Sequence, residues 1–200
     1  MKKLALLLVC LFAMNANAQV TIEPGVRAGL NISTFTNTDL GSRSDFYVGG
    51  LLGIKLAKFY TLQPEIIYSR QGAKGTFFRD DYYGGDVIAS NENYEIQYLS
   101  LALINKFKIV QGFHAVVGPN LDFRTGDNFS QYTERVEDFD IGLILGLGYT
   151  LPKGLTVEAR IKMGFVDIFG NQFDEYDYYD DRNNDLITNS TIQLGLAYTF

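Results

Sequence analysis

The sequence predicts an all-β fold: an eight-stranded antiparallel up-and-down transmembrane β-barrel that follows a cleaved N-terminal signal peptide. Three observations predict it. The chain starts with an export signal, eight later segments alternate between bulky apolar residues and small or polar ones, and the links between these segments are short and long by turns. Because successive side chains of a strand point to opposite faces, each alternating segment has one apolar face.

The first 18 residues have the layout of a secretory signal peptide. Lys2 and Lys3 precede an apolar run, residues 4–14, and the small-residue cleavage site Ala-Asn-Ala at 16–18. The apolar run is shorter than the ~20 residues that a membrane helix needs. We therefore expect residues 1–18 to be removed.

Residues 19–200 then form one outer-membrane β-barrel domain. The single cysteine, Cys10, lies in the signal peptide, so no disulfide is expected in the barrel. Lipid attachment at Cys10 is disfavoured because Val9 stands where a small residue is usual. The formal net charge of −6, which becomes more negative when the signal lysines are removed, argues against nucleic acid as a partner. A chain with 20 Gly, 13 Tyr and 15 Phe is compatible with either a soluble β-protein or a membrane barrel.

The first four segments alternate in order along the chain. Segment 24–34 sets Val, Ala, Leu and Ile against Gly, Arg and Asn, and segment 45–57 sets Val, Leu and Ile against glycines and a lysine. Segment 60–71, "YTLQPEIIYSRQ", has Glu65 on its polar face. Segment 94–106 has the least clear register. There we expect the outward residues Leu99, Leu101 and Leu103 and the inward residues Ser100, Ala102 and Lys106.

The last four segments have the same pattern. Segment 112–124 carries Gly, Asn and Asp on one face, and segment 137–150 sets Ile and three Leu against Asp and three Gly. Segment 154–167 sets Leu, Val, Ile and Met against Glu, Arg and Lys. Segment 190–200 alternates up to Phe200. It must pair with the first strand, because lipid cannot satisfy the backbone of a free sheet edge.

The links alternate in length. Those after the second, fourth and sixth segments are "KF", "FKIVQ" and "LPK", whereas the other links, beginning with "NTDLGSRS", are longer and polar. An even number of strands with short turns at one end and long loops at the other is typical of outer-membrane barrels. We expect the short turns and both chain termini to be periplasmic.

Glycines and charges decide which face lies inside. A soluble barrel would turn its apolar face inward, but a water-exposed face gains nothing from many glycines, which weaken strands. A crowded lumen needs small residues beside long ones, and its charges must be paired. We predict a packed salt-bridge network, with no sizeable pore, formed by the lumen residues Arg27, Lys55, Glu65, Asp122, Asp140, Glu158, Arg160 and Lys162.

Several stretches resemble one family in the expected order. They are "GVRAGLNIS" (25–33), "LQPEIIYSRQGAKG" (62–75), "VVGPNLDF" (116–123), "FDIGLILGLGYTLPKGLTVEARIKMG" (139–164) and "QLGLAYTF" (193–200). Together they resemble the PorT-like (porin family) outer-membrane β-barrel proteins of Bacteroidetes, which are Gram-negative bacteria. The resemblance implies an eight-stranded barrel and an assembly signal at Phe200, with Tyr198, that the barrel-assembly machinery reads. Ser100 and Ala102 depart from the family pattern, where Glu and Pro are frequent.

Catalytic and metal chemistry have weak support. The sole histidine, His114, has no predicted nucleophile beside it, so a role as a lumen or interface residue is favoured over catalysis. The acidic stretch "DEYDYYDDRNND" offers oxygen ligands for Ca²⁺, but without the order of an EF-hand loop, and a solvated loop is favoured. The Ca²⁺ candidates are Asp174, Asp177, Asp180 and Asp181. We expect no cofactor.

These features predict a small outer-membrane barrel with a structural or interaction role at the cell envelope, accessory to secretion or surface contact. Its expected partners are outer-membrane lipid, the barrel-assembly machinery and envelope proteins that contact the loops 72–93 and 168–189. One alternative is a narrow porin for ions or small solutes, and a lipid-modifying enzyme is a weaker one.

Overall fold

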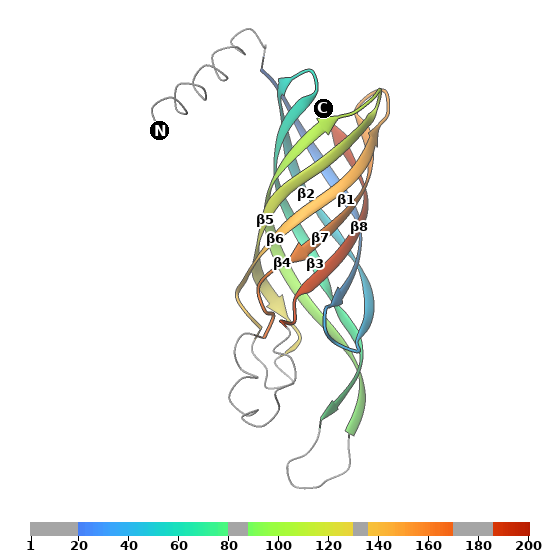
Figure 1. The fold of residues 1–200 in the computed structure, drawn as a ribbon, viewed down its shortest axis with the longest axis vertical. Helices are drawn as coiled ribbons and strands as arrows, with labels where there is room; N and C mark the ends of the chain where they lie inside the picture. The colour runs from blue at the N-terminus through green and yellow to red at the C-terminus, as the bar shows by residue number, and fades with distance from the viewer. Residues whose placement is uncertain (1–19, 80–87, 130–135, 170–185) are drawn as a thin grey trace, which may run out of the picture.

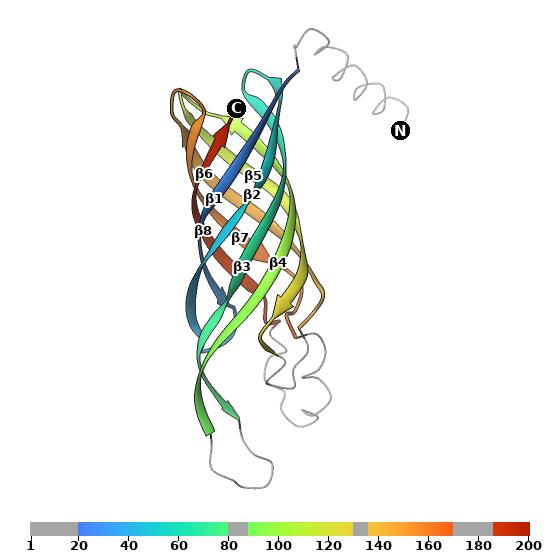
Figure 2. The ribbon, with the colours of Figure 1, turned by 180° about the vertical axis from the view of Figure 1, so that it is seen from behind.

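The chain forms a closed antiparallel β-barrel in a computed structural model that describes residues 20–79, 88–129, 136–169 and 186–200 (Figures 1 and 2). Within these residues each strand pairs with the next, and the last pairs with the first. The strands are β1 (Thr21–Phe35), β2 (Gly41–Ala57), β3 (Tyr60–Arg79), β4 (Ile88–Lys108), β5 (Phe113–Asp127), β6 (Phe139–Thr150), β7 (Leu155–Gly164) and β8 (Asn189–Thr199). The predicted fold class is confirmed.

The barrel closes where β8 pairs with β1, in a register that runs from Gly25 opposite Thr199 to Phe35 opposite Asn189. Closure leaves no strand edge whose backbone groups would face lipid unpaired. The links 58–59, 109–112 and 151–154 lie at one end together with the C-terminus, and we call this the turn end (Figure 1). The opposite end is the loop end. No helix among the described residues is long and apolar enough to cross a membrane.

The two faces of the sheet are divided as the sequence predicts. The outward side chains of Leu30 and Leu147 are 57% and 64% exposed, whereas the inward Arg27 is 3% exposed. An isolated barrel with this apolar outer surface requires lipid around it. The fourth strand follows the same rule, because Leu99, Leu101 and Leu103 are exposed while Ser100 and Ala102 are buried.

The main difference from the predicted boundaries is the length of β3 and β4 at the loop end. The sequence predicts a loop from residue 72, but β3 and β4 continue as a paired ribbon from Gly72 opposite Glu95 to Arg79 opposite Ile88 (Figure 2). Side-chain alternation is interrupted at Gly72, whose φ of +147° favours glycine. Backbone pairing does not depend on that alternation, so the ladder continues where the pattern stops.

The seventh strand is shorter than predicted and ends at Gly164. The Asp140 carboxylate accepts hydrogen bonds from the backbone N–H groups of Phe165 (3.2 Å) and Val166 (3.0 Å). The Phe165 N–H also donates to the Ile141 carbonyl oxygen at 2.9 Å, and the chain leaves the sheet after this contact.

Candidate functional site

The lumen is filled by three successive layers of side chains, which the inward residues of β1 mark in order. Arg27 belongs to a charged layer nearer the turn end, Asn31 to an amide layer in the middle, and Phe35 to an aromatic cap at the loop end. All three side chains are buried. Any path through the barrel would have to cross all three layers. For this reason we treat the lumen as the candidate functional site.

In the charged layer, Glu65 joins two guanidinium groups across the lumen. Arg27 Nη1 donates to Glu65 Oε1 at 2.9 Å, and Arg160 donates to both Glu65 oxygens at 2.9 Å. Arg27 Nη1 also donates to Glu65 Oε2 at 3.0 Å, and Gln63 Nε2 donates to Glu65 Oε1 at 2.7 Å. The carboxylate therefore accepts five hydrogen bonds from the described residues. Two-pronged Arg–carboxylate pairs are among the strongest hydrogen bonds in proteins.

The second carboxylate of this layer, Glu158, extends the network toward the turn end. It accepts a 2.8 Å hydrogen bond from Arg160 Nε and lies 3.4 Å from Arg27 Nη2. His114 Nε2 is 3.0 Å from Glu158 Oε1, and Lys106 Nζ is 3.7 Å from the same oxygen. Each buried charge therefore has an opposite charge beside it, which a low-dielectric interior requires.

Two glycines make room for the tyrosine that completes the charged layer. Gly29 and Gly195 lie opposite each other on β1 and β8, and a Cβ at Gly29 would approach the Tyr47 hydroxyl oxygen to 2.7 Å. That hydroxyl group accepts a hydrogen bond from Arg27 at 3.3 Å. The glycines of the inner face thus serve the interdigitation that the sequence predicts for a small barrel.

The amide layer is a chain of neutral hydrogen bonds. Asn31 Nδ2 donates to Ser69 Oγ at 2.9 Å, and Gln193 Nε2 donates to Asn31 Oδ1 at 3.0 Å. Gln71 Nε2 donates to Ser69 Oγ at 2.8 Å, and Asn189 Nδ2 donates to Gln71 Oε1 at 2.6 Å. These contacts join β1, β3 and β8, so they brace the barrel across the seam where it closes.

The eight predicted lumen charges do not form one network. Asp122 pairs with Lys162, whose ammonium group lies 5.8 Å from the Tyr98 ring centre, and Asp140 lies opposite Asp122 in the β5–β6 register. This second group is separate from the Arg27, Glu65, Glu158 and Arg160 network among the ion pairs of the described residues.

The assignment of Lys55 to the buried network is wrong. Its side chain is 50% exposed and pairs with Glu23 at the mouth of the barrel. Lys55 does lie on the inward face of β2, as the alternation predicts, but close to the end of the strand, where the lumen opens to solvent. Alternation indicates the face of a residue, and depth along the barrel axis must be known separately.

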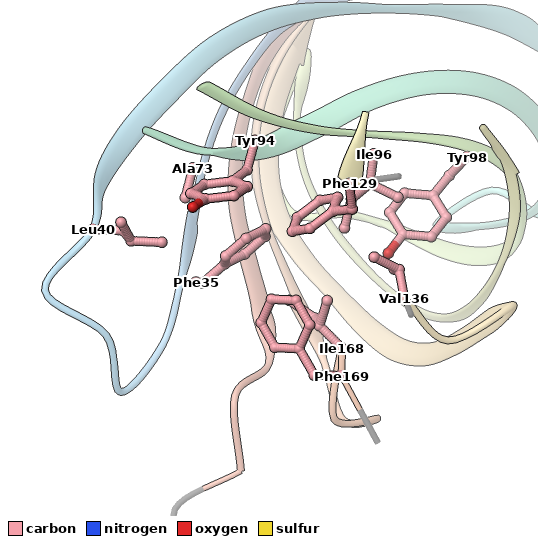
Figure 3. Close-up of a cluster of buried hydrophobic side chains, with 10 residues drawn as sticks. All are labelled: Phe35, Leu40, Ala73, Tyr94, Ile96, Tyr98, Phe129, Val136, Ile168 and Phe169. Carbon is pink, nitrogen blue, oxygen red and sulfur yellow. The ribbon is translucent and has the colours of Figure 1, made fainter. Parts of the chain in front are cut away.

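The aromatic cap closes the loop end, and its ring contacts are shown in Figure 3. Phe129 stacks on Tyr94 with ring centres 5.0 Å apart and meets the edge of Phe169 at 5.7 Å. Phe35 contacts Phe169 at 6.2 Å in an edge-to-face arrangement. The full cluster contains Phe35, Leu40, Ala73, Tyr94, Ile96, Tyr98, Phe129, Val136, Ile168 and Phe169.

Sequence reasoning missed this cap. Phe129, Val136, Ile168 and Phe169 follow or precede strands, in segments that the sequence assigns to polar loops. The signal that could have identified them is the presence of large apolar residues at the loop edges nearest the strands, where solvated loops are otherwise polar. Such residues fold back over the lumen because burial of each aromatic ring stabilises the fold by about 1.5–3 kcal/mol.

The remaining predicted sites are His114 and the Ca²⁺ candidates. His114 is 3% exposed, and its ring nitrogens face Glu158 and the Gly112 carbonyl oxygen, at 3.0 and 3.3 Å. This places it in the lumen, the first of the two expected locations. No group of three His, Cys, Asp or Glu residues suited to a metal occurs in the part of the chain that the structure describes. The signal peptide and the Ca²⁺ candidates Asp174, Asp177, Asp180 and Asp181 lie outside the described residues.

The predicted assembly signal lies at the turn end, where the Tyr198 and Phe200 rings are 5.4 Å apart. A second outward pair, Phe113 and Tyr149, has ring centres 4.7 Å apart. Aromatic residues at this level form the girdle expected at a membrane–water interface. The role of Phe200 and Tyr198 in recognition by the barrel-assembly machinery stays a prediction.

The closed barrel, its apolar outer face and its polar filled lumen define a class, the small integral β-barrels of the outer membrane. The particular family follows from comparison with protein-family models. The model described as "Outer membrane protein beta-barrel domain" matches residues 17–170, and the chain belongs to that family. No curated protein matches the chain in sequence.

Solved structures with a related arrangement include three bacterial proteins. Neisserial surface protein A is 12% identical with a TM-score of 0.49, over 92% of this chain and 100% of that one. Ail of Yersinia pestis, in complex with a heparin analogue, is 11% identical with a TM-score of 0.47, over 92% and 100%. OprG of Pseudomonas aeruginosa is 12% identical with a TM-score of 0.47, over 90% and 97%. Likenesses this distant carry no conclusion about function.

Proposed function

We propose that the protein is a non-conducting outer-membrane barrel that holds its loops at the cell surface for contact with other envelope components. The observation that carries this proposal is the filling of the lumen by the charged layer, the amide layer and the aromatic cap. An eight-stranded barrel has an interior just wide enough for side chains. With the lumen occupied, the loops and the barrel ends remain as the surfaces through which the protein acts.

The resemblance to PorT-like proteins supports an accessory role in secretion or surface contact. The loops 72–93 and 168–189 are the proposed contact segments, and residues 80–87 and 170–185 of these lie outside the described residues. The tyrosines in the second loop, Tyr176, Tyr178 and Tyr179, are a residue type enriched at recognition surfaces. No catalytic role is proposed, because His114 is held between Glu158 and Gly112.

The proposed orientation places the turn end in the periplasm and the loop end outside the cell. Because the cysteine at position 10 belongs to the predicted signal peptide, single cysteines can be introduced into a thiol-free barrel. Glu137→Cys at the loop end and Lys58→Cys at the turn end are both exposed positions. A membrane-impermeant maleimide applied to intact cells should label the first and spare the second, and the reverse pattern would contradict this orientation.

Photo-crosslinking tests the contact role directly. A photoreactive residue at Tyr178 should give discrete protein adducts in living cells, whereas one at Leu147, on the lipid-facing surface, should not. Loss of the adducts when Tyr176 and Tyr179 are replaced by Ser in the same photoreactive variant would support specific contact. If Tyr178 and Leu147 give the same products, the loops have no dedicated partner and the proposal fails.

A narrow porin is the second candidate function, and conductance separates it from the first. A lipid-modifying enzyme is disfavoured further, since His114 is buried within the charged layer. If His114→Gln leaves the lipid A profile of the cell unchanged, that third candidate is retired.

A further inference from the structure

The turn end of the barrel contains a cavity that lies outside the packed layers of the lumen and at the end opposite the long loops. Its volume is about 930 Å³, and it is lined by the ends of the strands and by the three short turns. We call it the basic vestibule, because five lysines and one acidic side chain, that of Glu23, line it within the part of the chain that the structure describes. The lysines are Lys55, Lys58, Lys106, Lys108 and Lys153.

The vestibule is blind toward the lumen. Its inner wall includes Gln63, Lys106 and His114, and each of these contacts a carboxylate of the charged layer. A molecule that enters from the turn end therefore meets a wall of packed side chains. Cavities of about 300–1,000 Å³ are the usual size for small-molecule sites.

The charge in the vestibule opposes that of the whole protein. The chain carries a formal net charge of −6, yet lysines collect at this one mouth. Lys55 pairs with Glu23 and Lys106 lies near Glu158, but Lys58, Lys108 and Lys153 have no ion-pair partner among the described residues. A recess lined mainly by charges of one sign concentrates counter-ions.

The chemistry of the lining suits a phosphate group. Lysine is a compact point charge with three donors and is a frequent phosphate ligand. Among the described residues, the lining of the vestibule includes five lysines and no arginine. Thr61, Thr150 and Thr156 add hydroxyl groups, which suit the additional oxygens of a phosphate.

We propose that the basic vestibule binds a phosphate ester through Lys58, Lys108 and Lys153. The rim carries the apolar rings of Phe59, Tyr198 and Phe200. Two sources therefore offer this chemistry: the headgroup of an anionic phospholipid in the adjoining leaflet, and a soluble phosphate compound. The inference goes beyond the proposed function, since it concerns the end of the barrel opposite the loops and stands whether or not the loops have a partner.

Calorimetric titration of the whole barrel in phosphatidylcholine nanodiscs with inorganic pyrophosphate tests the soluble source. Saturable binding should weaken at least tenfold in the triple variant Lys58→Gln, Lys108→Gln, Lys153→Gln. These three side chains are exposed, so the variant retains the packed lumen. Among single variants, Lys108→Gln should weaken binding several-fold, whereas Lys74→Gln, an exposed lysine at the loop end, should change it less than twofold.

Nanodiscs that contain phosphatidylglycerol test the lipid source. If the headgroup occupies the vestibule, the wild-type protein should bind pyrophosphate more weakly in these nanodiscs than in phosphatidylcholine. The triple variant should show the same weak residual affinity in both lipids. Binding in both nanodiscs identifies a soluble ligand, and binding in phosphatidylcholine alone identifies the headgroup; either result supports the site. Absence of saturable pyrophosphate binding in phosphatidylcholine nanodiscs, or equal affinity of the wild type and the triple variant, would overturn it.

Discussion

Substitution of Glu65 by glutamine tests whether the charged layer braces the barrel. The Glu65 side chain is 1% exposed and accepts hydrogen bonds from Arg27, Arg160 and Gln63. In Glu65→Gln, the buried Arg27 and Arg160 share one remaining carboxylate, that of Glu158. Removing one partner of a buried ion pair typically costs about 3–5 kcal/mol, because the remaining charge is left desolvated.

A matched control exists at the mouth of the lumen. Glu23 also pairs with a cation, Lys55, but that pair is solvent-exposed, and exposed pairs contribute about 0–1 kcal/mol. Glu23→Gln should therefore leave stability nearly unchanged. The free energy of unfolding is measured by urea titration of the barrel folded into phospholipid vesicles, with tyrosine fluorescence as the signal.

A double variant distinguishes loss of charge balance from loss of contacts. Glu65→Gln combined with Arg160→Met removes one charge of each sign, so the double variant should be more stable than the sum of the two single losses indicates. If Glu65→Gln costs less than about 1 kcal/mol, or if the two single losses simply add, the charged layer is not a coupled brace and the reasoning is refuted.

Three further predictions concern other parts of the barrel. Phe129→Ala should cost about 3–5 kcal/mol in the same titration, because it opens a cavity in the aromatic cap; a loss below 1 kcal/mol would mean that the cap is not packed. Gly49→Ala should destabilise the barrel by about 1–3 kcal/mol, because its Cβ would overlap the Ile66 carbonyl oxygen. A Cβ at the outward Gly50 has its nearest neighbour at 3.9 Å, so Gly50→Ala is the control. Equal effects of the two substitutions would contradict the assigned faces. At the loop end, beyond the apolar band, the hydrogen bond from Arg70 lowers the pKa of Glu95 from 4.5 to about 2. A lowered pKa in the folded state stabilises the protein above pH 4.5, and this stability is lost as the pH falls toward 2; Glu95→Gln should flatten the decline in urea midpoint over that range, and an unchanged slope would exclude the effect.

Much of the barrel follows from alternation alone. The period of two assigns each strand residue to lipid or lumen. It alone predicts that Arg27, Glu65, Glu158 and Arg160 face the lumen, where all four are buried. Their pairing was not predictable. It depends on the stagger of the strands, which brings Glu65 of β3 against Arg160 of β7 across the lumen. Alternation carries no information about stagger.

Alternation also does not predict how deep a residue lies along the barrel axis, or how loop residues pack. Lys55 has the inward parity of a lumen charge but lies near the strand end, in contact with solvent and Glu23. Phe129 and Phe169 belong to segments without alternation, so nothing in their local pattern indicates that they meet above the lumen. The basic vestibule was missed for a related reason, because its lysines come from strand ends and from separate turns.

The central claim is that packed side chains close the lumen, and single-channel recording tests it most directly. The purified barrel, reconstituted in a planar lipid bilayer, is predicted to give no stepwise conductance. Phe129→Ala with Glu65→Gln, which opens the cap and loosens the charged layer, provides a comparison in which leak is expected to rise. Discrete, reproducible conductance steps from the wild-type protein would contradict the claim and favour the narrow porin.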